Sequence, residues 1–290
     1  MPTLIDGRPA DHAPVGDRAL RYGDGLFETV LWQGNRLRLW SRHLDRLHHG
    51  CERLGLPQPD AASLESDLHT LLTLSGQRQP AVFRIQLTAG DGGRGYQRDN
   101  ASTPRRITTL SPLPKRPAAH WQRGIAVHCC RLRLADQPLL AGIKHCNRLE
   151  YVLARREWSD PAISEGLLLD ANGSVVEGIH MNTFALHGAT LLIPSLARCG
   201  VAGVMRGHLI ETATALGLTV EIDAHPLDAW LRADLVFMSN ALVGVLPVRR
   251  IGATTLGAGS AAARQALAAL IARIPDHDAV RAAMATGEEG

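Results

Sequence analysis

Turn signals between short apolar runs constrain the fold of this 290-residue chain most strongly. Gly34-Asn35, the Ala-Asn-Gly run at 171–173 and Gly188 each separate two runs of strand-like composition. Such closely spaced pairs are typical of β-hairpins. The regular β-α-β alternation of a doubly wound sheet is missing. We therefore predict an α/β protein of the α+β type, whose two lobes contain mixed or largely antiparallel sheets.

Apolar periodicity assigns the individual elements. Strands are expected at 3–8, 27–33, 36–40, 82–89, 107–110, 125–132, 166–170, 174–177, 183–187, 190–194, 218–223, 234–239 and 245–250. Helices are expected at 41–54, 61–75, 147–158, 203–216 and 259–273. The Pro-rich stretch 112–117 is the best linker in the chain. We accordingly predict an N-terminal lobe at 1–115, a linker at 116–124 and a C-terminal lobe at 125–290.

Bulk composition and charge exclude several classes of protein. The chain is 45% hydrophobic and 20% charged with a net charge of +3, which is ordinary for a soluble globular protein. Basic residues form no long run, so no nucleic-acid partner is expected. No apolar run approaches ~18 residues and the N-terminus lacks a signal layout, so no membrane association is expected. The five cysteines include no C-x-x-C pair, which indicates reduced thiols in a cytoplasmic protein.

Almost all basic side chains of this chain are arginines. Of 31 basic residues only Lys115 and Lys144 are lysines. Arginine can replace lysine as a surface charge, but it cannot act as a nucleophilic amine near neutral pH. Lys115 lies in the Pro-rich linker, whereas Lys144 lies between an apolar loop and a predicted helix. Lys144 is therefore the candidate for amine chemistry, and the alternative is that both are surface lysines retained by chance.

Several common catalytic motifs are absent from the sequence. There is no G-x-x-x-x-G-K-[ST] loop and no strand-linked G-x-G-x-x-G, so ATP and dinucleotide sites lack support. There is no G-x-S-x-G elbow, and none of the 13 histidines belongs to an H-E-x-x-H motif. The paired His48-His49 lies on a polar helix face and is interpreted as solvated. No metal site is predicted.

Four segments carry the motifs that remain. They are R-Y-G-D-G-L-F-E-T at 21–29, R-H-L-D-R-L at 42–47, A-G-I-K-H-C-N-R-L-E at 141–150, and V-V-E-G at 175–178 followed by G-V-M-R at 203–206. In this order and spacing they resemble the fold-type IV pyridoxal-phosphate enzymes, which include branched-chain aminotransferases, D-amino-acid aminotransferases and aminodeoxychorismate lyases. The resemblance covers nearly the whole chain. It implies a fold like that of D-amino-acid aminotransferase, pyridoxal 5′-phosphate as cofactor, and a homodimer with its active site at the subunit interface.

The resemblance also implies roles for residues around the cofactor ring. Lys144 resembles the family's lysine that forms a Schiff base with the cofactor, a reaction for which the amine must lose its proton. Glu177 resembles the glutamate that pairs with the pyridine nitrogen and keeps it protonated. Asn147, three residues after Lys144, is placed at the cofactor as well. The alternative interpretation is that Glu177 is an exposed strand residue with no role at the cofactor.

Further residues are implied at the cofactor phosphate. Arg46 resembles the family's phosphate-binding arginine, whose planar fork suits phosphate oxygens. The backbone N–H groups of Val204 and Met205 fall at a helix start, where the positive end of the helix favours an anion. Asn240 falls where relatives place further phosphate-binding groups, and the neighbouring Ala241 leaves open whether side chain or backbone contacts the phosphate.

The G-G-R-G-Y run at 92–96 decides between the reactions of this family. It resembles the aminodeoxychorismate lyases, which implies a small-molecule substrate whose carboxylate meets Arg94, with Tyr96 and Phe27 close by. The implied reaction converts 4-amino-4-deoxychorismate into 4-aminobenzoate, a folate precursor, and pyruvate. Leu20 stands where some lyases are thought to carry a hydroxyl proton donor, so Lys144, Tyr96, a nearby residue or water must deliver the proton. The alternative is an aminotransferase acting on D-amino acids or branched-chain amino acids.

Overall fold

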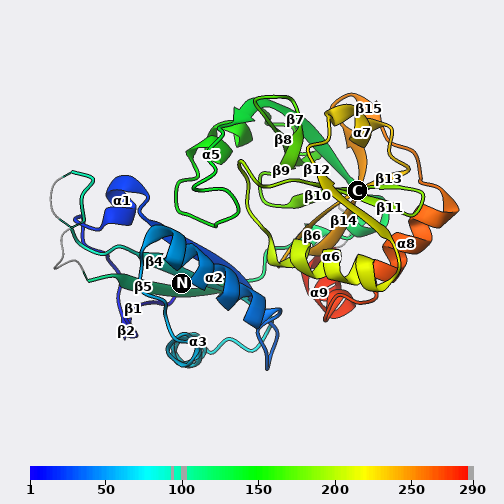
Figure 1. Cartoon of the computed structure of the whole chain (residues 1–290). Helices are drawn as coiled ribbons and strands as arrows, with labels where there is room; N and C mark the ends of the chain where they lie inside the picture. The colour runs from blue at the N-terminus through cyan, green and yellow to red at the C-terminus, as the bar shows by residue number, and fades with distance from the viewer. Residues whose placement is uncertain (93–94, 99–102, 287–290) are drawn as a thin grey trace. The chain divides into compact units, whose positions relative to one another are not determined.

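The computed structural model describes residues 1–92, 95–98 and 103–286 (Figure 1). The described residues divide into two units. The first unit contains 1–113 together with 143–148, and the second contains 114–142 and the described residues from 149 onward. Among the described residues, no helix has both the length and the apolar character needed to cross a bilayer.

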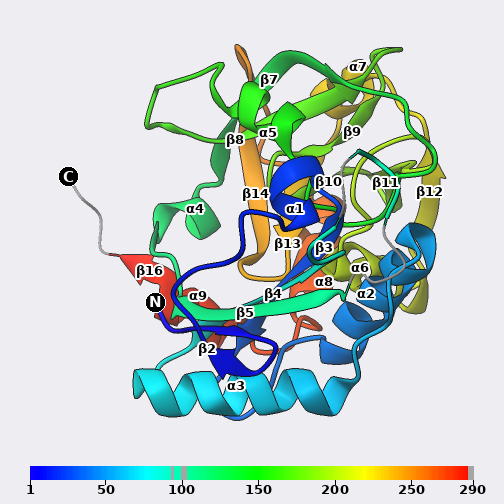
Figure 2. The ribbon, with the colours of Figure 1, turned by 90° about the vertical axis from the view of Figure 1, so that its left-hand side faces the viewer.

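Antiparallel strands and two long helices build the first unit. Its elements are β1 (Thr3–Ile5), β2 (Arg8–Pro9), α1 (Arg18–Tyr22), β3 (Gly25–Trp32), α2 (Trp40–Leu54), α3 (Ala61–Ser75), β4 (Ala81–Thr88) and β5 (Arg105–Pro112). The strands form a sheet in the order β2-β1-β5-β4-β3. Helix α2 packs on β3, while α3 lies beside β1 and β5 (Figure 2). Both helices therefore cover the apolar residues of this sheet.

Close packing of α2 on β3 depends on Gly50. A Cβ atom at Gly50 would lie 2.9 Å from two carbons of Leu26, which is fully buried on β3. Leu47 and Cys51 on the same helix face are also buried. The face of β3 that carries Leu26 also carries Glu28, so this packing places Glu28 under α2.

The segment that carries Lys144 extends the sheet of the first unit beyond β3. Phe27 N donates to Lys144 O at 2.9 Å, and Cys146 N donates to Gly25 O at 2.8 Å. Leu26 and His145 pair across these bonds as an isolated antiparallel bridge. The sequence placed this segment within the lobe at 125–290, but these backbone bonds group it with the first unit.

A larger mixed sheet builds the second unit. Its elements are β6 (Arg116–Pro117), α4 (Ala119–Gln122), β7 (Ile125–Leu134), α5 (Leu149–Arg155), β8 (Ile163–Asp170), β9 (Val175–Gly178), β10 (Asn182–His187), β11 (Thr190–Pro194), α6 (Val204–Ala215), β12 (Thr219–Asp223), α7 (Leu227–Leu231), β13 (Leu235–Asn240), β14 (Gly244–Ile251), β15 (Thr254–Thr255), α8 (Ala261–Ile271), α9 (His277–Met284) and β16 (Ala285–Thr286). Eight strands pair in the order β12-β11-β10-β13-β14-β7-β8-β9, and β15 joins β14.

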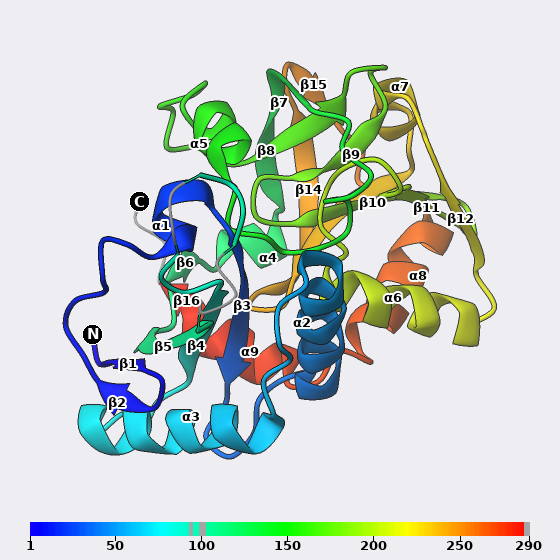
Figure 3. The ribbon, with the colours of Figure 1, turned by 60° about the vertical axis from the view of Figure 1, so that its left-hand side comes forward.

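Parallel and antiparallel pairs both occur in this sheet. Strand β7 runs parallel to β8 and β14, whereas β10 runs antiparallel to β11 and β13. The sheet curls, because β9 also lies beside β10. Helix α6 packs on β12 and β13 and lies next to α8 (Figure 3). The predicted α+β class with mixed and antiparallel sheets is therefore confirmed.

Two local expectations differ from the structure. The strand expected at 36–40 is reduced to a single bridge between Trp32 and Leu37, because Leu39 has a left-handed backbone (φ 54°) and α2 begins at Trp40. The linker expected at 116–124 contains β6 and α4, and Trp121 of α4 is buried. Because burial of the Trp121 indole removes apolar surface from water, it stabilises a folded conformation of the segment at 116–124.

Candidate active site

Lys144 lies beside the aromatic ring of Phe27 in the first unit. Its Nζ atom is 4.3 Å from the ring centroid, and the side chain is half-buried. The guanidinium carbons of Arg84 and Arg148 lie 4.4 Å and 5.9 Å from the same centroid. Three cationic side chains therefore gather around one apolar ring. This arrangement suits an anionic molecule better than a cation.

The imidazole next to Lys144 does not add to this positive charge. Burial, together with Arg148 and Lys144, lowers the pKa of His145 to about 4. The ring is therefore neutral near neutral pH, and Nδ1 of His145 is buried without a hydrogen-bond partner.

Arg46 is held on the helix-covered face of the same sheet. Its Nε donates to Oε1 of Glu28 at 2.8 Å and its Nη2 to Oε2 at 2.5 Å. His43, one helical turn earlier on α2, bonds through Nδ1 to the same Oε2 at 2.7 Å. Glu28 is 1% exposed and His43 is fully buried. The guanidinium of Arg46 is therefore fixed in orientation, in contrast to a mobile surface charge.

The protonation state of this cluster follows from its surroundings. Burial raises the pKa of Glu28, but the charges and hydrogen bonds of Arg46 and His43 outweigh it and lower the pKa to about 2. Burial lowers the pKa of His43, and Glu28 opposes that effect only in part. Glu28 is therefore an anion, and neutral His43 donates its Nδ1 proton to it. Arg46 remains the cation of the cluster.

Glu177 is a buried carboxylate in the second unit. It is 3% exposed and accepts hydrogen bonds from Tyr151 Oη at 2.6 Å, Asn182 Nδ2 at 3.2 Å and Val201 N at 3.0 Å. Three donors stabilise the ionised form of a carboxylate. Glu177 is therefore a buried, hydrogen-bonded carboxylate and is not the exposed strand residue of the alternative interpretation.

The start of α6 lies next to this carboxylate. Gly203 is the N-cap residue, and a Cβ atom there would lie 2.0 Å from Oδ1 of Asn182. Asn182 also donates to Val201 O at 3.0 Å, so one side chain links Glu177 to the chain that enters the helix. Val204 and Met205 form the first turn of α6, and a glycine N-cap offers no side chain to their N–H groups. The positive end of α6 is accordingly suited to an anion.

The two asparagines predicted at the cofactor have structural contacts of their own. Asn240 accepts from the backbone N–H groups of Leu242 and Val243, both at 2.9 Å, and donates to His180 O. Asn147 is exposed, and its Nδ2 lies 3.4 Å from Gly23 O. These contacts give Asn240 a role in shaping the turn after β13.

The predicted substrate residues are placed only in part. Arg94 lies outside the described residues. Tyr96 is 88% exposed, its ring meets Tyr22 edge-on at 5.6 Å, and its carbonyl accepts from Arg18 Nη2 at 2.8 Å. Leu20, which the sequence placed in a proton donor's position, lines a pocket that also contains Phe27.

Several residues of these clusters were missed by sequence reasoning. They are Glu28, His43, Arg84, Arg148, Tyr151 and Asn182. The i, i+3 spacing of His43 and Arg46 gave one available signal, because it places both on one helix face. Alternation of polar residues along β4 gave another, since it directs Arg84 away from the apolar core.

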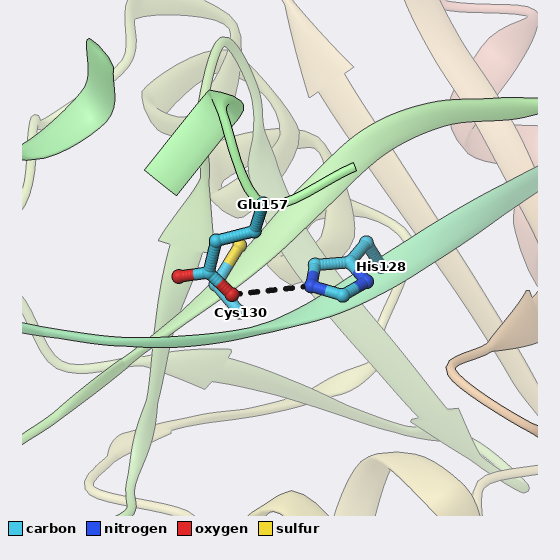
Figure 4. Close-up of side chains that lie close together, drawn as sticks. All are labelled: His128, Cys130 and Glu157. Atoms are coloured by element: carbon cyan, nitrogen blue, oxygen red, sulfur yellow. Dashed lines mark hydrogen bonds and ion pairs between the residues drawn. The ribbon is translucent and has the colours of Figure 1, made fainter. Parts of the chain in front are cut away.

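A further group of potential ligand atoms combines His128 and Cys130 of β7 with Glu157, which follows α5. Nε2 of His128 lies 3.2 Å from Oε2 of Glu157, and Cys130 Sγ is nearby (Figure 4). The Glu157 carboxylate also accepts the backbone N–H groups of Arg131 and Leu132, at 2.7 Å and 2.9 Å. The register of β7 against β8 shifts at this point. Stabilisation of an irregular strand therefore explains the position of Glu157.

Comparison with known proteins identifies the family of this chain. The Amino-transferase class IV family model matches residues 25–251. An aminodeoxychorismate lyase from Vibrio harveyi is 34% identical over 251 residues, covering 86% of this chain and 91% of that protein. A crystal structure of 4-amino-4-deoxychorismate lyase from Pseudomonas aeruginosa superposes with a TM-score of 0.86 at 43% identity, covering 94% and 99% of the two chains. A D-alanine aminotransferase from Bacillus licheniformis is 25% identical over 266 residues, covering 90% and 92%.

Proposed function

Because the chain belongs to the amino-transferase class IV family, we propose that it is a pyridoxal 5′-phosphate-dependent lyase that converts 4-amino-4-deoxychorismate into 4-aminobenzoate and pyruvate. The observation that carries this proposal is the likeness to two aminodeoxychorismate lyases over nearly their whole length. The aminotransferase shares fewer residues with the chain. The product 4-aminobenzoate is a folate precursor.

The chain provides groups that fit each part of this cofactor. In this proposal Arg46 and the N–H groups of Val204 and Met205 bind the phosphate, Glu177 pairs with the pyridine nitrogen, and Lys144 forms the covalent link. Support comes from the Gly203 N-cap, where Asn182 leaves no room for a side chain, and from the three hydrogen bonds that the buried Glu177 carboxylate accepts. The bound cofactor supplies an electron-accepting ring for the carbon that loses its proton.

Lys144 performs the proton transfers in this proposal. Its neutral amine removes the proton from the ring carbon that carries the substrate amine. The carbon–oxygen bond to the three-carbon fragment then breaks, and the ring becomes aromatic. Lys144 returns the proton to the methylene carbon of that fragment, which completes pyruvate. One proton is removed and one is delivered, so no further co-reactant is needed.

Features of the neighbouring side chains support the assignment of both proton transfers to Lys144. Leu20 carries no exchangeable side-chain proton. The side chain of Tyr96 is 88% exposed and packs on Tyr22, whereas Lys144 is half-buried beside Phe27. A half-buried amine transfers a proton within a positioned complex, which makes the reaction effectively intramolecular.

An assay with two arms tests the proposed function. Purified protein with added cofactor receives 4-amino-4-deoxychorismate, and pyruvate and 4-aminobenzoate are measured over time. A parallel arm supplies D-alanine or leucine with a keto acid and measures amino transfer. We expect equimolar pyruvate and 4-aminobenzoate, formed faster than any transaminated product. Faster amino transfer would replace the lyase proposal with the aminotransferase alternative.

We also propose that the enzyme is a cytoplasmic homodimer. Helix α5 exposes Leu149 (69%), Val152 (55%) and Leu153 (45%), which are spaced to share one face. Burial of such a face in a symmetric dimer removes apolar surface from water. All five cysteines are free thiols, which supports a reducing compartment.

Light scattering tests the assembly. We expect a mass of twice 31.3 kDa for the unmodified protein and a shift toward the monomer for Val152→Glu. Leu74→Glu, at an exposed leucine of α3, is the matched control and should remain dimeric. A fully active monomer contradicts the dimer proposal.

A further inference from the structure

One carboxylate of the first unit lies between two arginines. The side chain of Asp24 is 15% exposed, and its Oδ2 accepts from Arg18 Nε at 2.9 Å. The same oxygen accepts from Arg98 Nε at 3.0 Å, while Oδ1 accepts from Arg98 Nη2 at 2.5 Å. Burial raises the pKa of Asp24, but the hydrogen bonds from Arg98 and Arg18 outweigh burial and keep this pKa below its ordinary value. Asp24 is therefore an anion that links two guanidinium groups.

Arg18 binds a loop segment to this carboxylate. Its Nη1 donates to the carbonyls of Gly95 and Gln97 at 3.2 Å and 3.3 Å, and its Nη2 donates to Tyr96 O at 2.8 Å. Arg18 is 3% exposed, and a Cβ atom at Gly92 would lie 2.6 Å from its Cδ. One closely packed guanidinium thus binds three consecutive carbonyls of the chain.

Arg98 binds the end of the same segment to helix α2. Its Nη1 donates to Leu54 O at 2.6 Å and to Gly55 O at 2.9 Å. These carbonyls belong to the last residue of α2 and to its C-cap, where the partial negative charge of the helix end favours a cation. The Arg98 side chain is 30% exposed, so this link lies nearer to solvent than Arg18. Segment 95–98 is therefore bonded both to α1 and to α2.

Helix α1 connects these bonds to a pocket of about 440 Å³. Arg18 is the first residue of α1, and Ala19 and Leu20, which follow it, line the pocket. Tyr22 is the last residue of α1, and the Tyr96 ring meets it edge-on at 5.6 Å. The bonds that hold the loop segment therefore also hold the helix that forms one wall of the pocket.

We propose that Arg98 is a positioning residue for the substrate, because it holds segment 95–98 against the α1 wall of the pocket. It acts through the Asp24 carboxylate that it shares with Arg18. This inference rests on the proposed function, in which the run at 92–96 meets the substrate. A segment that is already positioned loses less conformational entropy when the substrate binds. Loss of Arg98 should therefore weaken substrate binding more than it slows the chemical step.

Steady-state kinetics of Arg98→Gln on the cofactor-loaded enzyme test this inference. We expect KM for 4-amino-4-deoxychorismate to rise roughly fivefold to tenfold, as for the loss of about one net hydrogen bond. A loss of binding that is equal in the ground state and the transition state leaves kcat within about twofold of its unmodified value. Arg53→Gln, at an exposed arginine in the last turn of α2, is the matched control and should keep the unmodified KM.

Chymotrypsin cleavage after Tyr96 tests the position of the segment without turnover. The Tyr96 side chain is 88% exposed, but Arg18 binds the carbonyl of the peptide bond that the protease would cut. Cleavage requires that this carbonyl leave Arg18, so its rate follows the opening of the segment. We expect cleavage of the Tyr96–Gln97 bond to be roughly tenfold faster in Arg98→Gln, measured by mass spectrometry. Arg53→Gln should be cleaved at the unmodified rate.

Arg98→Lys decides the test if Arg98→Gln does not fold. It retains the positive charge beside Asp24 but loses the planar fork, so we expect a KM and a cleavage rate between those of the unmodified enzyme and Arg98→Gln. The inference is overturned by an unmodified KM or an unmodified cleavage rate in the folded Arg98→Gln variant. A fall in kcat as large as the fall in kcat/KM also overturns it, because the variant would then act on chemistry.

The two measurements separate this inference from the proposed function. An enzyme that lacks lyase activity but is cleaved faster in Arg98→Gln refutes the proposed function and supports the role of Arg98 in holding the segment. An active lyase whose KM and cleavage rate do not change in Arg98→Gln refutes this role and leaves the proposed function standing.

Discussion

Glu28 holds Arg46 through two parallel hydrogen bonds between a strand and the helix that covers it. The carboxylate is 1% exposed, and the Arg46 side chain is 11% exposed. Separation of such a pair leaves an uncompensated buried charge, which is strongly destabilising. Arg46 is therefore pre-oriented before any anion binds, so little side-chain entropy is lost when it binds one.

Arg46→Ala is expected to weaken the binding of pyridoxal 5′-phosphate more than it alters chemistry. A charge-assisted hydrogen-bonding group contributes about 1.5–3 kcal/mol, or roughly ten- to a hundredfold in affinity. Titration of the cofactor by absorbance measures the change. Arg53→Ala, at an exposed arginine of the same helix, is the control and should bind normally. Unchanged affinity in Arg46→Ala would remove this residue from the phosphate site.

Acid should destabilise the protein through Glu28. The folded-state pKa of about 2 lies below the ordinary value of 4.5, because the attraction of Arg46 and His43 exceeds the opposing effect of burial. The contribution of the carboxylate is therefore complete above pH 4.5 and is lost as the pH falls toward 2. We expect a loss on the order of a few kcal/mol in this window, measured by urea unfolding at successive pH values.

Glu28→Gln is the matched variant for this pH dependence. The variant side chain has no carboxylate to take up a proton in acid. The unfolding free energy of this variant should therefore fall less steeply as the pH falls from 4.5 toward 2. At neutral pH it should already be less stable than the unmodified protein. Identical slopes in the two proteins contradict the role assigned to Glu28.

Glu177→Gln should retain the cofactor but lower kcat. The substitution removes the negative charge that keeps the pyridine nitrogen protonated, and the ring then accepts electrons less readily. Tyr151→Phe removes the 2.6 Å hydrogen bond to Glu177 and should lower kcat by less, on the order of fivefold for about 1 kcal/mol. Steady-state kinetics with saturating cofactor measure both. A full rate in Glu177→Gln with bound cofactor means that another group meets the ring nitrogen.

Hairpins of the second unit could be predicted because their signals are local. Asn172-Gly173 lies between β8 and β9, and Gly173 has a φ of 81°, a conformation that favours glycine. The short hairpin at Gly188, with a φ of 56°, follows the same rule. The strand expected at 36–40 does not form, because Leu39 adopts a left-handed backbone and α2 begins at Trp40. The turn residues at 34–35 do not indicate where that helix begins.

The site could be predicted only where a motif names a residue. Glu28 lies inside a recognised segment, but its partner Arg46 follows 18 residues later and only the fold brings the two together. Tyr151 lies in a predicted helix with no motif to mark it as the donor to Glu177. The charge balance around Phe27 likewise depends on three separate segments of chain, so Arg84 was not singled out.

Lys144→Ala should lower lyase turnover by at least ~10³-fold. Proton transfer alone contributes roughly 10²–10⁴-fold, and loss of the covalent link adds to it. The absorption band of the lysine-linked cofactor should disappear as well. Lys115→Arg is the control, because Lys115 is exposed and its Nζ donates only to the Ala283 carbonyl at 2.6 Å among the described contacts. Near-native turnover in Lys144→Ala would exclude this residue as the base.

Borohydride reduction of the cofactor-loaded enzyme, followed by peptide mass spectrometry, tests the central claim most directly. Reduction converts the covalent cofactor–lysine link into a stable adduct, and the chain offers only two lysine side chains for it. We expect a pyridoxyl phosphate adduct on the peptide that contains Lys144 and none on the peptide that contains Lys115. An adduct on Lys115, or no adduct on either peptide in a catalytically active preparation, contradicts the assignment of Lys144.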